Sequence, residues 1–229
     1  MIILAGGLGT RLRGAIPHLP KALAPIQGTP FLQILLKKLL RFSRISKMII
    51  ALGHKADEIS SFLRPLPSIV LSIESVPLGT GGAILQALDK TNQETLLVVN
   101  GDTFFNIDLD SFYEFHKKKH SLATLAIRYE QNKKGFGSLK INSDLSIARF
   151  EEKSTSSNKG WVSGGVYLFE KKLFSGFKKN QNYSLEYDLL PLFIQKKAFA
   201  YCSAATFIDI GTPESYDQAQ HLLQPWISQ

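Results

Sequence analysis

The sequence has a single cysteine, Cys202, in 229 residues. One cysteine excludes an intrachain disulfide framework and a zinc site built from several thiolates, and Cys202 itself is expected in the core of a strand. Long apolar runs are also missing, and the mean hydropathy is −0.01, which does not fit a membrane-spanning protein. The apolar run Ile2–Ala5 has no basic segment before it and is followed at once by glycines, so it predicts a buried strand rather than a signal peptide. These absences favour a cytoplasmic protein without a membrane partner.

Acidic residues are missing from the first 56 positions, and the first one is Asp57. Nine lysines and arginines precede it, so the net charge of +8 is concentrated in this segment. A basic segment without acids that contains glycine-rich turns indicates a site for a highly charged anion. Arg11 and Lys21 are the candidate ligands of that anion. Three other cations of the segment are expected on the solvated face of one helix: Lys37, Lys38 and Arg41.

Signatures of nucleic-acid-binding modules are missing, although the sequence pI is about 9.5. No zinc finger, basic zipper or RNA-recognition motif occurs, and the later lysines are scattered among acids, which predicts solvated faces and no nucleic-acid partner. The histidines also lack the spacing of a metal site. They are expected at the surface or in loops: His18, His54, His116, His120 and His221.

Apolar runs alternate with segments of helical periodicity through about residue 120. The predicted strands of this half are Ile2–Ala5, Met48–Leu52, Ile69–Ile73 and Thr95–Val99. The predicted helices begin at Thr29-Pro30, with Thr29 as N-cap, and continue with Ala56–Leu63, Thr80–Leu88 and a helix within Leu109–Lys118. The second half adds strands at Leu122–Tyr129, Gly137–Ile141, Ile147–Glu151 and Val162–Phe169, and helices at Ser184–Gln195 and Pro213–Leu223. This order predicts one α/β domain, a mixed and mostly parallel sheet with helices on both faces.

The first strand leads directly into the glycine-rich turn Gly6-Gly7-Leu8-Gly9-Thr10-Arg11. Glycines after a strand allow backbone N–H groups to approach a polyphosphate without interference from Cβ atoms. A Walker loop does not fit, because Gly14 is followed by Ala15 and not by Lys-Ser or Lys-Thr. A dinucleotide fingerprint does not fit either, because Leu12 occupies the third glycine position and no acid follows for the ribose. The turn is therefore a candidate phosphate cradle of another kind.

The segment Leu4–Leu12, with Pro20-Lys21 and Pro25 after it, resembles the signature of the sugar-phosphate nucleotidyltransferases. Further motifs of that family follow in order along nearly the whole chain: Pro77–Gly82, Asn100–Asp102, Phe150–Lys153, Gly164–Tyr167 and Phe207–Glu214. The resemblance implies a Rossmann-like nucleotide-diphospho-sugar transferase fold over residues 1–229. It also implies a nucleotide-binding half at about 1–120 and a sugar-binding half at about 121–229.

The implied reaction is attack by a sugar 1-phosphate on the α-phosphate of a nucleoside triphosphate, with release of pyrophosphate. Both reactants are anionic, so catalysis depends on neutralising charge and aligning the attack. Arg11 is expected on the β- and γ-phosphates because its planar fork suits phosphate oxygens. Asp102 and Asp209, each at the end of a strand, are expected to hold Mg²⁺ between the phosphates. The remaining nucleotide contacts implied by the resemblance are Leu4, Gly6, Gly7, Gly9, Thr10, Lys21, Gly79 and Thr80.

The resemblance also implies a sugar pocket, in which Lys153 meets the sugar phosphate and completes a catalytic set with Arg11, Lys21 and Asp102. The other members of this pocket are expected to be Gly137, Glu152, Ser163, Gly164 and Glu186. Glu74 is expected to face the base. A carboxylate accepts two hydrogens from guanine and one from uracil, so Glu74 favours guanine.

Departures from the family pattern leave the sugar and the base open. Family members commonly read Arg-Leu-x-Pro-x-Thr where this chain has Arg11–Ile16, and Trp-x-Asp-x-Gly where it has Phe207–Gly211. Within the family, Asn100–Phe105 and Phe207–Gly211 look most similar to the D-glycero-D-manno-heptose 1-phosphate guanylyltransferases. Mannose 1-phosphate guanylyltransferases and N-acetylmuramate 1-phosphate uridylyltransferases share much of the pattern. A non-catalytic nucleotide-sugar binding protein is the rival from another class, and assembly as a homo-oligomer is left open.

Overall fold

The computed structural model describes residues 1–12, 14–64, 66, 68–133, 135–151 and 158–227. Within these residues a nine-stranded sheet forms the centre of the molecule, and two small two-stranded sheets lie beside it. The strands are β1 (Ile2–Leu4), β2 (Pro25–Ile26), β3 (Thr29–Pro30), β4 (Met48–Leu52), β5 (Ile69–Ile73), β6 (Thr95–Asn100), β7 (Thr103–Phe105), β8 (Ala123–Glu130), β9 (Ser138–Ile141), β10 (Ile147–Glu151), β11 (Gly160–Glu170), β12 (Ala198–Cys202) and β13 (Phe207–Asp209).

The described helices connect and cover these strands. The α-helices are α1 (Phe31–Leu39), α2 (Ala56–Leu63), α3 (Gly79–Ala87), α4 (Leu109–Lys118), α5 (Leu190–Ile194), α6 (Pro213–Leu222) and α7 (Gln224–Ile227). A π-helical turn, η5 (Leu185–Leu189), leads into α5, and four short 3₁₀ turns complete the set: η1 (Thr10–Leu12), η2 (Lys21–Leu23), η3 (Leu88–Lys90) and η4 (Lys171–Phe174).

The central sheet has the order β10-β9-β11-β6-β1-β4-β5. Strand β8 also pairs with β11, and β12 pairs with β8. Strands β6, β1, β4 and β5 are parallel to one another, as expected for strands linked through helices. Strand β11 runs antiparallel to β6 and carries the second half of the chain, in which β8, β9 and β10 also pair in antiparallel fashion. The predicted mixed α/β sheet is confirmed. Its parallel pairs lie in the first half of the chain, except that β12 pairs in parallel with β8 in the second half.

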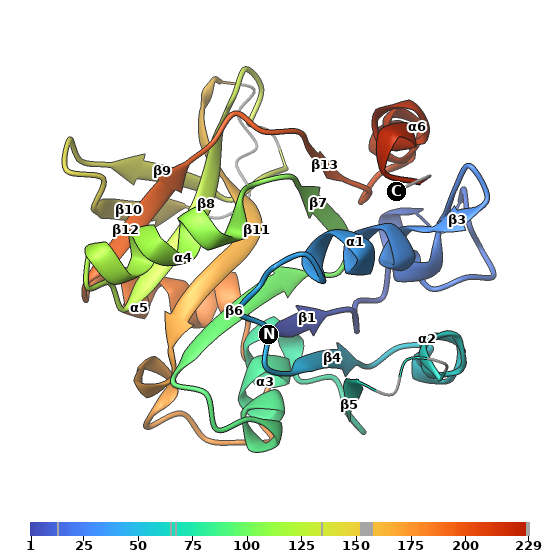
Figure 1. Ribbon diagram of the computed structural model, residues 1–229, viewed down its shortest axis with the longest axis horizontal. Helices are drawn as coiled ribbons and strands as arrows, with labels where there is room; N and C mark the ends of the chain where they lie inside the picture. The colour runs from blue at the N-terminus through green and yellow to red at the C-terminus, as the bar shows by residue number, and fades with distance from the viewer. Residues whose placement is uncertain (13, 65, 67, 134, 152–157, 228–229) are drawn as a thin grey trace.

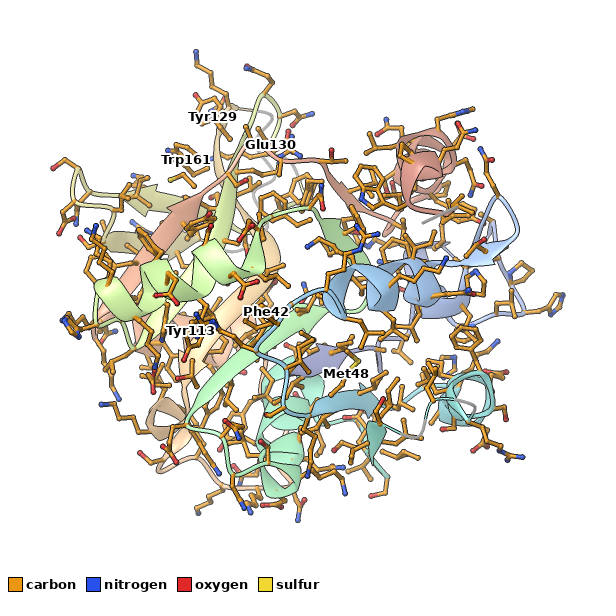
Figure 2. The ribbon with its side chains drawn as sticks, viewed as in Figure 1. Phe42, Met48, Tyr113, Tyr129, Glu130 and Trp161 are labelled. Carbon is orange, nitrogen blue, oxygen red and sulfur yellow. The ribbon has the colours of Figure 1, made fainter. Side chains whose placement is uncertain are left out.

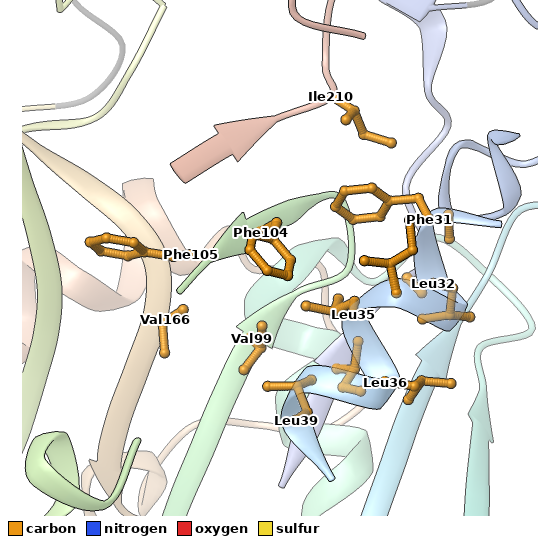
Figure 3. Close-up of a cluster of buried hydrophobic side chains, with 14 of the residues drawn as sticks. Phe31, Leu32, Leu35, Leu36, Leu39, Val99, Phe104, Phe105, Val166 and Ile210 are labelled. Carbon is orange, nitrogen blue, oxygen red and sulfur yellow. The ribbon is translucent and has the colours of Figure 1, made fainter. Parts of the chain in front are cut away.

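Alternating residues of the central strands face two separate cores. In β1, Ile3 packs into a core with α1, α2, α4 and α6, whereas Ile2 packs into the other core with α3, η5 and α5. Figure 1 shows α1 and α4 in front of the sheet and α5 behind it. Figure 3 shows the first core, where leucines of α1 at helical spacing meet Val99 of β6 and Phe104 of β7. The prediction of helices on both faces is therefore confirmed.

The first helix begins later than predicted, because Thr29-Pro30 forms strand β3 and not a helix cap. Thr29 pairs with Ile26 across a hairpin whose turn residues, Gln27 and Gly28, both have positive φ. Pro30 has an extended backbone with ψ of 134°, and no side chain caps α1. The predicted N-cap role of Thr29 is wrong because the turn chemistry of Gln27-Gly28 prevails.

Three further predictions about burial are wrong. Lys38 lies inside and not on a solvated face, because its ammonium donates to the carbonyl oxygen of Ile107 at 3.1 Å. His116 is fully buried in α4, with its ring nitrogens 2.7 Å from Thr124 Oγ1 and 3.1 Å from a Glu170 carboxylate oxygen. Cys202 is exposed, because β12 pairs on one side only and Cys202 is its last residue. None of the helices in the described segments combines the length and the apolar character needed to cross a membrane.

Candidate active site

The Asn100-Gly101-Asp102 turn is held against the end of β1. The N–H group of Gly101 donates to the carbonyl oxygen of Leu4 at 2.8 Å. A Cβ atom on Gly101 would lie 2.7 Å from that same oxygen, so the close approach requires glycine. Because β1 and β6 are parallel neighbours, this contact places Asp102 at the edge of the sheet where the Gly6-Gly7 turn begins.

Asp209 reaches the same place through the small sheet formed by β7 and β13. In this antiparallel pair Asp209 lies opposite Thr103, the residue after Asp102. The N–H group of Ile210 also donates to the carbonyl oxygen of Asp102 at 3.0 Å. Two aspartates that are 107 positions apart in the sequence (209 − 102) are thereby fixed as neighbours.

Lys21 joins the two aspartates. Its ammonium lies 2.6 Å from Asp102 Oδ2 and 3.5 Å from Asp209 Oδ1, and its side chain is only 11% exposed. Lys21 opens η2, and a Cβ atom on Gly9, which has φ of +58°, would lie 3.2 Å from the Cβ atom of Lys21. The glycine-rich turn therefore packs directly on the lysine that forms ion pairs with both carboxylates.

Arg11 converges on the same point from η1. A Cβ atom on Gly211 would lie 2.5 Å from Asp209 Oδ1, 3.1 Å from Lys21 Nζ and 3.2 Å from Arg11 Nη2. Gly211 therefore adjoins all three charged groups, and its own N–H group donates to Asp209 Oδ1 at 2.5 Å. The predicted grouping of Arg11 and Lys21 with the two aspartates is present in the structure.

The two aspartates differ in proton affinity. Burial raises the pKa of Asp102, but the Lys21 ammonium and the hydrogen bonds from Lys21 and Thr103 outweigh burial, so this pKa lies below its ordinary value. Burial and the neighbouring Asp102 carboxylate raise the pKa of Asp209 above its ordinary value, and Lys21 and Arg11 compensate only in part. An additional cation between the carboxylates would favour the ionised form of both.

The carboxylates of Asp102 and Asp209 have the chemistry of a magnesium site. Both are hard oxygen donors, and their side chains are 36% and 29% exposed, so a hydrated cation can reach them. The described part of the chain has no group of three or more histidine, cysteine, aspartate or glutamate side chains able to hold a metal. Two carboxylates with substrate phosphates as the other ligands is the arrangement that Mg²⁺ commonly takes, whereas an all-protein cage is not. The residues present therefore fit this ion.

Two cavities meet at Asp102. The smaller has a volume of about 330 Å³ and the larger about 920 Å³, and both are lined by Thr80, Asn100 and Asp102. Elements of the first half form most of the smaller cavity, whereas elements of the second half form most of the larger cleft. The charged group described above therefore lies at the junction of two adjoining binding spaces.

The wall of the smaller cavity carries one carboxylate that is not part of the charged group at the junction, that of Glu74. Glu74 follows β5, and its Oε2 atom accepts a hydrogen bond from the N–H group of Leu78 at 3.1 Å. A Cβ atom on Gly53 would overlap the Glu74 carboxylate, so glycine leaves the space that this side chain occupies. Burial raises the pKa of Glu74 above its ordinary value, and the hydrogen bond from Leu78 offsets this only in part. The predicted nucleotide ligands on this wall are Leu4, Gly6, Gly7, Lys21, Glu74, Gly79, Thr80 and Asp102.

The comparison with known families bears directly on this pair of cavities. The family described as "Nucleotidyl transferase" matches residues 1–224. The chain belongs to this nucleotidyl transferase family. The predicted enzyme class, the family and the fold class are thereby confirmed.

Relatives within the nucleotidyl transferase family cover the whole chain. A D-glycero-alpha-D-manno-heptose 1-phosphate guanylyltransferase from Aneurinibacillus thermoaerophilus is 39% identical, with 99% of each chain covered. An enzyme of the same name from Campylobacter jejuni is 37% identical over 94% of this chain and 96% of its own. The crystal structure of HddC from Yersinia pseudotuberculosis complexed with GMP-PN has a TM-score of 0.84 and 34% identity, with 96% of each chain covered.

Three of the six predicted sugar-side residues line the larger cleft, namely Gly137, Ser163 and Glu186, and Arg11 and Asp209 line it as well. Gly137 is required by packing, because a Cβ atom there would lie 2.7 Å from the ring of Phe150. The hydroxyl of Ser163 lies 3.1 Å from the buried hydroxyl of Tyr167.

Other predicted site residues lie elsewhere. Gly164 lines neither cavity, because the ring of Phe105 lies within 2.5 Å of where its Cβ would be, and the neighbouring Gly165 lines the larger cleft instead. Gly9 and Thr10 line neither cavity. Glu152 and Lys153 lie outside the described residues.

Sequence reasoning missed several residues that line the larger cleft. Asn100 lines both cavities, and the signal available in the sequence was its place in the motif Asn100–Asp102. Tyr167 and Phe207 also stand inside quoted motifs. The other missed residues carry no local signature, because they reach the cleft by strand alternation and by packing of segments that are distant in the chain: Arg128, Glu130 and Phe136.

Proposed function

We propose that the protein transfers a guanylyl group from GTP to D-glycero-D-manno-heptose 1-phosphate and releases pyrophosphate. The observation that carries this proposal is the convergence of Arg11, Lys21, Asp102 and Asp209 where the two cavities meet. The choice of substrates is supported by the names of the two relatives that cover nearly the whole chain at 39% and 37% identity. We place the reaction in the cytoplasm.

The division of labour follows the two cavities. We assign the smaller cavity and residues 1–120 to the nucleotide, and the larger cleft and residues 121–229 to the sugar phosphate. Glu74 would accept hydrogen bonds from N1–H and N2–H₂ of guanine, and the backbone of Gly79 and Thr80 would contact the base. The reacting phosphates would then lie beside Asp102, between the two ligands.

Asp102 and Asp209 would hold Mg²⁺. When bound, this ion neutralises phosphate charge and makes the α-phosphate a better electrophile. The chain supplies further positive charge: Arg11 would donate its guanidinium hydrogens to the outer phosphates and stabilise the pyrophosphate that leaves. The Lys21 ammonium would donate to phosphate oxygens while it keeps Asp102 ionised.

The acceptor needs a second set of groups. We expect Lys153 to donate to the phosphate of the sugar and Glu152 to accept from sugar hydroxyls, in a segment outside the described residues. Ser163 and Glu186 would complete the wall around the sugar. The reaction needs no covalent intermediate on the protein, because attack and departure occur in line on one phosphorus atom once both substrates are aligned.

Two other substrate pairs fit the same site: GTP with mannose 1-phosphate, and UTP with N-acetylmuramate 1-phosphate. Guanine is favoured over uracil because Glu74 can accept two hydrogens from guanine and one from uracil. A protein that binds nucleotide sugars without catalysis is the alternative from another class. The complete set of charged residues at the junction argues against that alternative, since binding alone does not require two neighbouring carboxylates.

The test is a matrix of four nucleoside triphosphates against the 1-phosphates of heptose, mannose, glucose and N-acetylmuramate, with Mg²⁺ present and pyrophosphate release as the readout. We expect GTP with heptose 1-phosphate to give the highest kcat/KM. A higher kcat/KM for another pair contradicts the substrate assignment, and binding without pyrophosphate release in any pair contradicts catalysis.

Variants separate catalysis from folding. Asp102→Asn and Asp209→Asn should each lower kcat by at least about 100-fold, because each removes a carboxylate from the proposed ion site. Both variants should keep the circular dichroism spectrum of the parent chain. Unchanged turnover in Asp102→Asn would remove the metal assignment.

A further inference from the structure

Two charged residues of β8 project into the larger cleft from the same side of the strand. Arg128 lies opposite Val162 and Glu130 lies opposite Gly160 in the pairing with β11. Residues two apart in a strand share a face, so both reach the cleft, while Tyr129 between them faces the other way and packs edge-on against Trp161 with ring centres 5.4 Å apart. Figure 2 shows Glu130 at the same end of the sheet as Tyr129 and Trp161, displaced toward β13.

Arg128 and Glu130 form a shielded ion pair. The Nε atom of Arg128 lies 2.8 Å from Glu130 Oε1, and the two side chains are 24% and 22% exposed. The N–H group at this Nε is buried, is not directed at the carboxylate and has no hydrogen-bond partner among the described residues. An arginine–glutamate pair that is largely removed from water on the wall of a cleft is a fixed polar feature that a polar ligand group can contact.

Phe207 holds the guanidinium in place. The guanidinium carbon lies 4.9 Å from the centre of the Phe207 ring, a cation–π contact. The same ring packs against Phe105 and Phe136, with ring centres 5.5 and 5.9 Å away, so the platform beneath Arg128 is fixed by three aromatic residues.

The platform also fixes how far Arg128 lies from the proposed ion site. Phe207 and Asp209 are two residues apart in β13 and share a face, a separation of about 7 Å along a strand. Arg128, placed over the Phe207 ring, therefore lines the same cleft as Asp209 but is displaced from the proposed ion site by about two residues of β13.

We propose that Arg128 and Glu130 together bind hydroxyl groups of the exocyclic side chain of the sugar, and so determine which sugar 1-phosphate is accepted. This inference rests on the proposed function. A hydroxyl group both donates and accepts, and an arginine–glutamate pair offers donors and an acceptor side by side. Glu130 also neutralises most of the charge of Arg128, which makes the pair a poorer partner for a phosphate than Arg11 and Lys21 are.

The test compares the binding of two sugar 1-phosphates by Arg128→Gln, Arg128→Lys and the parent chain. The two sugars are heptose 1-phosphate and mannose 1-phosphate, which differ only in the exocyclic side chain on C5 of the ring, where the heptose carries one more CHOH unit. Dissociation constants are measured by calorimetry with a non-hydrolysable GTP analogue and Mg²⁺ present, and kcat and KM are measured by pyrophosphate release. Arg149→Gln is the matched control, because Arg149 pairs with Glu151 two residues away in β10, at 3.2 Å, but does not line the cleft.

We expect Arg128→Gln to weaken binding of the preferred sugar 1-phosphate by about tenfold or more, to reduce the ratio of the two affinities toward one, and to change KM for GTP less than twofold. Arg128→Lys should recover little of the affinity that Arg128→Gln loses, because an ammonium lacks the planar set of donors of a guanidinium. Arg149→Gln should match the parent chain.

Three results would overturn the inference. If Arg128→Gln weakens the binding of both sugar 1-phosphates equally and Arg128→Lys restores it, Arg128 binds the phosphate. If the affinities are unchanged in Arg128→Gln, Arg128 binds no part of the sugar. A chain that binds neither sugar 1-phosphate would also refute it. A chain that binds the sugars without releasing pyrophosphate refutes the proposed function alone, since calorimetry then still reports on Arg128.

Discussion

The Lys21 ammonium lies 2.6 Å from the Asp102 carboxylate, although 81 positions separate the two residues in the sequence. This ion pair decides the charge state of the site, because burial alone would protonate Asp102 more readily. The glycine-rich turn, the lysine and the aspartate therefore act as one electrostatic unit.

Replacing Lys21 by Met should move the acid limb of the rate profile. Burial remains in this variant while the ammonium is lost, so the pKa of Asp102 should rise, and the decline of kcat/KM on acidification should begin at a higher pH. We expect kcat at neutral pH to fall by about 100-fold or more, measured by pyrophosphate release. Lys47→Met is the control, because Lys47 donates to the Lys90 carbonyl oxygen and lines neither of the two cavities. An acid limb that stays in place would contradict the role of Lys21.

Replacing Glu74 by Gln should weaken guanine recognition selectively. We expect KM for GTP to rise about tenfold or more, with little change in KM for the sugar 1-phosphate, because an amide oxygen is a weaker acceptor and the amide hydrogens oppose those of guanine. Burial raises the pKa of Glu74, so this carboxylate takes up a proton earlier as the pH is lowered. On acidification, KM for GTP in the parent chain should therefore begin to increase at a higher pH than it would with an ordinary glutamate. Steady-state kinetics with GTP and UTP provide the measurement. Glu58→Gln on α2 is the control, and an unaltered GTP-to-UTP preference in Glu74→Gln would refute base recognition by this residue.

Replacing Gly164 by Ala should destabilise the fold. The added Cβ would lie 2.3 Å from a ring carbon of Phe105, which is itself buried against Phe207. We expect a loss of about 1–3 kcal/mol in the free energy of unfolding, and a fall in Tm of several degrees by thermal denaturation. Gly160→Ala in the same strand is the matched control, because its Cβ would meet only Lys133 at 3.6 Å. Equal melting temperatures for the two variants would show that the Phe105 ring moves aside without loss of stability.

Buried His116 should make the stability of the fold depend on pH. Burial lowers the pKa of His116 and Glu170 opposes this only in part, so in acid the unfolded chain takes up the proton first. Stability from this residue is present above about pH 6.5, the ordinary value for histidine, and is lost as the pH falls below it. We expect Tm to fall between pH 7 and pH 5, and to fall less in His116→Gln. The exposed His221→Gln serves as control. A parent chain and a His116→Gln variant with the same pH dependence would contradict this expectation.

The sequence predicted the parallel half of the fold well, because apolar strands and amphipathic helices there carry strong periodicity. Met48–Leu52, Ala56–Leu63 and Ile69–Ile73 have the observed bounds. The meeting of Asp102 with Arg11 was also predictable, since both follow strands that end at one edge of a parallel sheet.

Tertiary contacts decided what the sequence did not reveal. In the sequence Lys38 looks like any helical lysine, and only the fold brings the carbonyl oxygen of Ile107 to it. The burial of His116 in α4 likewise depends on a contact with Glu170 of β11, which is distant in the sequence. Arg128 and Glu130 are ordinary charged residues in an alternating strand, and only the packing of Phe207 shows that their side of the strand faces a cleft.

The pairing of β13 with β7 has a consequence for engineering. The last described strand of the chain pairs with β7 in the first half and places Asp209 there, so the two halves of the chain are interlocked and cannot be exchanged independently. A chimaera that borrows the sugar-recognition segment of a relative would therefore inherit a foreign β13. The pairing register of that β13 with Thr103–Phe105 of this chain would have to be restored before a new sugar specificity could be measured.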